Sequence, residues 1–206
     1  MSAGAPAFPR LRWLGPAWLA VWLPAYLWQY GPAVFLNLCD VAVILTCVGL
    51  WTGSPLLLSS QALSSLVVDV AWNVDLAVRA LFGVHLVGGT GYMWEPKYPL
   101  WLRLLSLFHV WLPIVLVWGL RKLGYDRRAF LAQSVLAAVV MAASRLLSNP
   151  ADNQNFAFRD PFLGRTFGPA PVHVALTTAA LVGLLYWPLH RLLAKKVRPP
   201  RSPPGA

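Results

Sequence analysis

Six apolar segments, each close in length to a bilayer-spanning helix, dominate this sequence. They lie at 11–29, 33–51, 56–80, 99–119, 130–147 and 172–193. A helix needs about 20 apolar residues to cross the hydrocarbon core of a membrane. Only 12% of the residues are charged, whereas about a quarter are charged in an ordinary soluble domain. The sequence therefore predicts an all-α, polytopic transmembrane helix bundle that forms a single domain over residues 1–193.

The first segment is the least regular of the six. Pro16 and Pro24 interrupt it, and a proline inside a helix removes a hydrogen bond and kinks the chain. The segment therefore either crosses the membrane as a kinked helix or lies at the interface. Arg10 and Arg12 precede it as in a signal peptide, but no small-residue cleavage site follows. We expect a retained first span.

The orientation follows from the placement of lysine and arginine. With an even number of spans, most basic residues fall on one side of the membrane: Arg10, Arg12, Arg121, Lys122, Arg127, Arg128, Arg191, Lys195, Lys196, Arg198 and Arg201. Such residues accumulate on the cytoplasmic side. The pattern predicts a multi-pass protein of the cell membrane with both termini in the cytoplasm. Residues 194–206 are basic and rich in proline, and we expect a disordered tail.

The net charge of +10 does not indicate nucleic-acid binding, because the basic residues lie mostly at span ends, where they set topology. Membrane lipids are the expected partners, and the sequence identifies no protein partner. It contains no Walker loop, dinucleotide fingerprint or HExxH motif. Cys39 and Cys47 lie eight residues apart on one helix, about 12 Å, which excludes a disulfide between them. We expect no metal and no cofactor.

Polar residues recur every four positions in the segment 56–80. Gln61, Ser65, Asp69 and Asn73 thereby form a stripe along one helix face. An aspartate at the centre of a membrane helix costs on the order of 3 kcal/mol and usually faces a protein interior or a watery cavity. The stripe either holds this helix to its neighbours by hydrogen bonds or forms one wall of a polar cavity.

Two further segments carry residues that suit acyl-transfer chemistry. Cys39 and Asp40 lie in the segment 33–51, and His109 lies in the segment 99–119. At 1.5 Å per residue, Cys39 lies about 9 Å and His109 about 15 Å from the outer ends of their helices. Adjoining, tilted helices would bring them together. A cysteine beside a histidine can lose its proton and become a nucleophile, although a buried cysteine often only fills space.

Short motifs extend this interpretation. The stretches LNLCDVAVILT, FHVWLP, LGYDRRAFLAQ, NPADNQNF and LYWPLH occur in this order over about 33–190. This arrangement resembles the bacterial YwaF-like integral membrane proteins, which are related to the androgen-induced family of intramembrane lipid hydrolases and acyltransferases. In that family a cysteine or threonine of an early span acts with a histidine of a later span. The resemblance implies that Cys39 and His109 cleave or transfer a lipid acyl ester.

The leading hypothesis is thus an intramembrane lipid-ester hydrolase or acyltransferase. Cys39 would be the nucleophile and His109 the base, oriented by Asp69 or Asn73. Four polar residues are expected to contact the substrate, of which two belong to the long outer connection 148–171: Asp40, Asn73, Asn153 and Asn155. The alternative is a non-catalytic membrane protein with a binding, transport or structural role, in which the polar stripe lines a passage or joins helices.

Overall fold

The computed structural model describes residues 7–86 and 89–200, and these residues form helices joined by short connections. The α-helices are α1 (Leu11–Tyr30), α2 (Leu38–Thr52), α3 (Pro55–Phe82), α4 (Leu100–Leu105), α5 (Phe108–Leu123), α6 (Ala129–Leu147), α7 (Ala170–Ala180) and α8 (Trp187–Lys196). Short 3₁₀-helices occur at Pro32–Leu36, Gly91–Trp94 and Gln154–Phe156. Within the described ranges there is no β-strand, so the predicted all-α helix bundle is confirmed.

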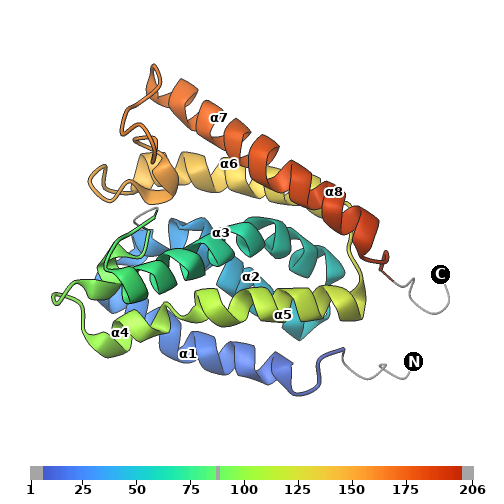
Figure 1. Cartoon of the computed structure of the whole chain (residues 1–206). Helices are drawn as coiled ribbons and strands as arrows, with labels where there is room; N and C mark the ends of the chain where they lie inside the picture. The colour runs from blue at the N-terminus through green and yellow to red at the C-terminus, as the bar shows by residue number, and fades with distance from the viewer. Residues whose placement is uncertain (1–6, 87–88, 201–206) are drawn as a thin grey trace.

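Helix α3 lies at the centre of the bundle. It packs against α2, α5 and α6, while α1 packs on α2 and α7 packs on α6 (Figure 1). Helix α1 begins and α8 ends at the same end of the bundle, together with the connection between α5 and α6 (Figure 1). The connections between α3 and α4 and between α6 and α7 lie at the opposite end. Successive helical segments therefore run up and down.

Three of the predicted helical segments are interrupted. The segment 33–51 consists of a 3₁₀-helix and α2, with extended backbone at Asn37 between them. The segment 99–119 is divided into α4 and α5 by a turn at 106–107. In the last segment, a π-helical turn at Leu181–Tyr186 joins α7 to α8. Irregular turns inside long helices frequently mark functional positions.

Local sequence explains the sharp turn between α2 and α3. Gly53 ends α2 in the left-handed conformation, with φ of 67°, which glycine adopts without strain. The Ser54 hydroxyl then accepts a hydrogen bond from the backbone N–H of Leu57, and Pro55 stands at the first helical position. A serine cap followed by proline is a strong start signal for a helix, so α2 and α3 become antiparallel neighbours.

Large apolar side chains lie on the surface, and several polar side chains lie inside the bundle. Leu146 is 80% exposed, Leu184 74% and Leu131 69%. The side chains of Gln61, Asp69 and Gln133 are fully buried, together with many other polar side chains. Among the described residues, Leu100–Leu123, Ala129–Leu147 and Ala170–Lys196 are long and apolar enough to cross a membrane. An apolar surface with polar side chains kept inside the bundle suits a lipid environment.

The beginning of the predicted tail is ordered. Helix α8 continues to Lys196, and the backbone N–H of Tyr125 donates to the carbonyl of Arg198 at 2.8 Å. The Arg198 guanidinium also donates to the carbonyl of Lys122 at 3.0 Å. These contacts hold the chain against the connection between α5 and α6. The rest of the predicted tail, 201–206, lies outside the described residues.

Candidate functional site

A polar cavity of about 920 Å³ lies between the helices at the end of the bundle that carries the α3–α4 and α6–α7 connections. Its wall comes from α1, the beginning of α2, α3, the beginning of α5 and the π-helical turn. Residues of the two connections, among them Lys97 and Asp152, also line it. The volume is within the range of about 300–1,000 Å³ typical of ligand pockets.

A histidine–aspartate pair lies beside this cavity. The Nδ1 atom of His109 donates to Oδ1 of Asp69 at 2.7 Å, and both side chains are buried. The ring of Trp72 stacks on the imidazole with a centroid distance of 4.6 Å. The side-chain amide of Asn73 donates to the backbone carbonyl of His109 at 2.7 Å. Helix α3 thus fixes the position of His109 through three side chains and leaves its Nε2 atom for other partners.

Helix α3 carries this pair because its polar residues recur with the helical period. Asp69 and Asn73 are four residues apart, and Trp72 lies on the same face, three residues after Asp69. Further along the stripe, the Gln61 amide donates to Gln133 of α6 at 3.4 Å, whereas Ser65 lines the cavity. The stripe therefore performs both roles considered above: it joins helices and it forms a wall.

Cys39 and Asp40 line the same cavity as His109. Both lie in the first turn of α2, directly after the break at Asn37, and Asp40 accepts a hydrogen bond from the Asn37 amide at 3.2 Å. His109 likewise occupies the first turn of α5, directly after the break at 106–107. Among the described contacts, no hydrogen bond joins the Cys39 thiol to the His109 ring. Cys39 and His109 thus line the same cavity, but no described hydrogen bond joins their side chains.

The two asparagines of the α6–α7 connection have different positions. Asn155 lines the cavity. Its side-chain oxygen accepts from the backbone N–H of Leu38 at 3.0 Å, and its amide donates to the carbonyl of Leu36 at 2.7 Å. Asn153 is absent from the cavity wall and organises its own connection, donating to the carbonyl of Arg159 and accepting from the N–H of Phe158. The expected substrate contact by Asn153 has no counterpart in this geometry.

Several tyrosines of the cavity wall escaped the sequence interpretation. The hydroxyls of Tyr26 and Ser106 share a hydrogen bond of 2.7 Å, which joins α1 to the break before α5. Tyr186, at the end of the π-helical turn, accepts from the Gln133 amide at 3.4 Å. Tyr92 comes from the α3–α4 connection. No periodic signal marks these positions, because each contact joins residues that are far apart in the sequence.

Charges at the cavity mouth come from the connection before α4. Lys97 donates to the Glu95 carboxylate at 2.6 Å, and this hydrogen bond is the main reason that the pKa of Lys97 is raised. Lys97 therefore remains a cation at neutral pH. Burial raises the pKa of the Tyr92 phenol, so this group stays protonated at neutral pH.

Within residues 7–86 and 89–200, no three histidine, cysteine, aspartate or glutamate side chains gather closely enough to hold a metal ion. Searches of protein-family models, curated proteins and solved structures find no match to this chain. The class of protein that the fold and the cavity define is thus a helical bundle with an apolar exterior and a polar interior pocket.

Proposed function

We propose that this chain is an integral protein of the cell membrane that cleaves or transfers an acyl ester of a lipid. Cys39 acts as the nucleophile, His109 as the general base and acid, and Asp69 as the residue that orients His109. The observation that carries this proposal is the hydrogen bond of 2.7 Å between Asp69 and His109 beside a cavity that also contains Cys39. The thiol can act as a nucleophile, the imidazole as its base and the carboxylate as the group that orients the imidazole.

The reaction follows from the two nitrogens of His109. Nδ1 is bound to Asp69, which leaves Nε2 to take the proton of the Cys39 thiol. The thiolate attacks the ester carbonyl carbon, the ester C–O bond breaks, and the departing alcohol takes the proton back from His109. The acyl group is then a thioester on Cys39. His109 next deprotonates water or an acceptor alcohol, which attacks the thioester and releases the acid or a new ester together with the free thiol.

Cys39 lies in the first turn of α2, where the helix dipole contributes a partial positive charge. For proton transfer, the Cys39 sulfur and the Nε2 atom of His109 have to approach to about 3–4 Å. Catalytic hydrogen bonds are often long before the substrate binds. The breaks at Asn37 and at 106–107 are the places where the helices can adjust.

A lipid is the proposed substrate because the cavity lies inside an apolar exterior. Leu38, Val68 and Phe108 supply apolar wall for an acyl chain. Lys97, which is exposed, supplies a cation at the mouth for a polar headgroup. Asp40 and Asn155, also in the wall, are proposed to bind the polar part of the substrate near the ester.

The proposed topology has six spans and cytoplasmic termini. The six spans are α1, the 3₁₀-helix with α2, α3, α4 with α5, α6, and α7 with α8. Arg121, Lys122, Arg127 and Arg128 lie at or near the connection at the end of the bundle where α1 begins and α8 ends. Since basic connections stay in the cytoplasm, this end is cytoplasmic and the cavity opens toward the outer leaflet.

The test is ester turnover by purified protein in micelles containing a long-chain p-nitrophenyl ester. Cys39→Ala and His109→Ala should abolish both turnover and the acyl adduct on Cys39, which mass spectrometry should detect in the wild type. The matched control is Cys47→Ala, because Cys47 is a buried cysteine outside the cavity wall. Equal turnover by the wild type and by both cavity variants would falsify the proposal.

A second candidate function is lipid binding without chemistry. It is favoured by the lack of a hydrogen bond between Cys39 and His109 among the described contacts, while the cavity itself is large and polar. In that case, the wild type and Cys39→Ala would bind the same lipid equally well, and neither would release p-nitrophenol.

A further inference from the structure

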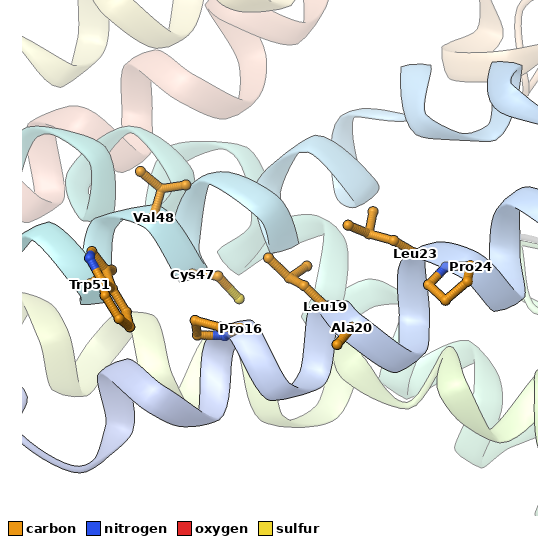
Figure 2. A pocket seen from close by; sticks show the side chains of 8 residues that line it. All are labelled: Pro16, Leu19, Ala20, Leu23, Pro24, Cys47, Val48 and Trp51. Carbon is orange, nitrogen blue, oxygen red and sulfur yellow. The ribbon is translucent and has the colours of Figure 1, made fainter.

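A second, apolar cavity lies between α1 and α2. Its volume is about 520 Å³, and Figure 2 shows the side chains that line it: Pro16, Leu19, Ala20, Leu23, Pro24, Cys47, Val48 and Trp51. Apart from the Cys47 thiol and the Trp51 indole N–H, these side chains offer no polar group. We call this cavity the α1–α2 groove. A groove with such a wall suits a hydrocarbon chain and little else.

The shape of the groove follows from small residues and prolines on α1. At Gly15 an added Cβ would lie 3.1 Å from the Cβ of Cys47, so the two helices are in close contact just beside the groove. Beyond this contact, α1 presents Ala20 between two prolines, Pro16 and Pro24. The groove extends from Pro16 to Pro24 of α1, a rise of about 12 Å at 1.5 Å per residue.

A positive charge lies at the Pro16 end of the groove. Arg12 precedes Pro16 by one helical turn, so the two residues share a face of α1. The Arg12 guanidinium lies 5.6 Å from the ring of Trp51, which lines the groove, and 5.4 Å from the ring of Trp13. The Nε atom of Arg12 is buried and has no hydrogen-bond partner among the described residues. Such an orphaned donor is rare and points to a missing acceptor.

The surroundings of Arg12 favour an anion. The first turn of α1 contains no acidic side chain, and the helix N-terminus adds partial positive charge. Trp13 and Trp51 meet edge to face at 4.7 Å, and tryptophans with arginine are typical of the membrane–water interface. A lipid with an anionic headgroup would therefore pair its charge with Arg12 and place its acyl chain against the apolar wall of the groove.

We propose that the α1–α2 groove binds one acyl chain of an anionic phospholipid whose phosphate contacts Arg12. The phosphate supplies an acceptor for the Arg12 guanidinium, and the chain covers the apolar wall. A second copy of this protein packed on the groove would leave the Arg12 donor without its anion. This site is separate from the polar cavity, and the binding does not depend on the proposed ester chemistry.

Native mass spectrometry of delipidated full-length protein tests the proposal, with phosphatidylglycerol or phosphatidylcholine added in mixed micelles. Ala20→Phe fills the groove, and its matched control is Ala17→Phe, because Ala17 is also exposed on α1 but does not line the groove. Arg12→Gln removes the cation, and its control is Arg191→Gln on α8. The wild type and both controls should retain one more phosphatidylglycerol than Ala20→Phe.

Arg12→Gln should weaken phosphatidylglycerol binding about tenfold, as expected for the loss of a charge-assisted hydrogen bond, and leave phosphatidylcholine binding unchanged. Equal retention of phosphatidylglycerol by the wild type and Ala20→Phe would overturn the proposal. So would a dimer that Ala20→Phe dissociates, since a second copy would then occupy the groove. If Ala20→Phe does not fold, phosphatidylglycerol retention by Ala20→Leu and by Arg12→Gln is compared with that of the wild type instead. Equal retention by all three proteins would then overturn the proposal.

Discussion

The side-chain oxygen of Asn155 accepts a hydrogen bond from the backbone N–H of Leu38, the first residue of α2, at 3.0 Å. The side chain that caps the beginning of a helix normally belongs to the residue just before the helix, and asparagine is one of the preferred residues there. Here the preceding residue, Asn37, makes no such capping bond, and the connection between α6 and α7 supplies the cap instead. Asn155 thus fixes the beginning of α2, and with it Cys39, from a distant part of the chain.

Replacing Asn155 by alanine should therefore destabilise the protein. The variant loses the cap of α2 and the hydrogen bonds to Leu36 and Ser144, so we expect a loss of about 1–2 kcal/mol. Thermal unfolding followed by tryptophan fluorescence measures this change. The matched control is Asn149→Ala in the same connection, because Asn149 is exposed and should change the stability by less than about 0.5 kcal/mol. Equal melting temperatures for both variants would contradict the capping role.

The hydrogen bond between Asp69 and His109 can be tested through its effect on ester turnover. Asp69→Asn keeps the shape of the side chain but removes the charge that orients the ring and stabilises its protonated form. We expect ester turnover to fall by two to four orders of magnitude, roughly as for the equivalent change in a Ser-His-Asp triad. Asn73→Ala removes hydrogen bonds to the backbone carbonyls of Asp69 and His109 but none to the His109 ring, and it should reduce turnover far less. Unchanged turnover in Asp69→Asn would exclude the orienting role.

The positions of α1 and α6 could be predicted from the sequence, because apolar residues predominate there over the length of a bilayer span. The predicted segment 11–29 corresponds to α1 at Leu11–Tyr30, and 130–147 corresponds to α6 at Ala129–Leu147. The position of Asp69 on the same face as Asn73 also followed from the helical period. These features depend on local sequence alone.

The breaks beside the cavity could not be predicted in the same way. Neither glycine nor proline marks the turn at 106–107, and the bond between Tyr26 and Ser106 that accompanies it joins α1 to the α4–α5 segment. The break at Asn37 depends likewise on Asn155, which lies in another connection. Such contacts arise only when the bundle forms, so the geometry around Cys39 and His109 needed the structure.

Leu58 lies between two glycines of neighbouring helices, and this arrangement predicts a sensitive packing site. An added Cβ at Gly49 of α2 or at Gly119 of α5 would lie 2.9 Å from a methyl carbon of the fully buried Leu58. The leucine cannot retreat from one helix without pressing on the other. We expect Gly119→Ala to lower the stability by about 1–3 kcal/mol, measured by thermal unfolding.

The control for this site is Gly183→Ala, where an added Cβ meets no atom within 4 Å among the described residues. That variant should be neutral or slightly more stable. In the double variant Gly119→Ala with Leu58→Val, the smaller side chain should recover part of the loss. Strictly additive effects of the two substitutions would show that Leu58 is not the source of the strain.

The connection between α5 and α6 contains an ion pair whose effect depends on pH. Asp126 accepts from the backbone N–H of Arg128 at 3.0 Å and from its guanidinium at 2.7 Å, and chiefly the side-chain hydrogen bond lowers the pKa of Asp126. The unfolded chain, with a pKa near the ordinary value of about 3.9, binds the proton first as the pH falls. The stabilisation is therefore complete well above pH 4 and disappears as the pH falls through the lowered pKa of the folded state.

Two variants test this ion pair. Asp126→Asn and Arg128→Gln should melt at a lower temperature than the wild type at pH 7, and their melting temperatures should approach that of the wild type near pH 3. The control is Arg127→Gln, which should show no such convergence, because among the described hydrogen bonds the Arg127 guanidinium contacts only the carbonyl of Ala194, at 3.5 Å. A gap between Asp126→Asn and the wild type that is as large at pH 3 as at pH 7 would mean that the carboxylate charge does not stabilise this connection.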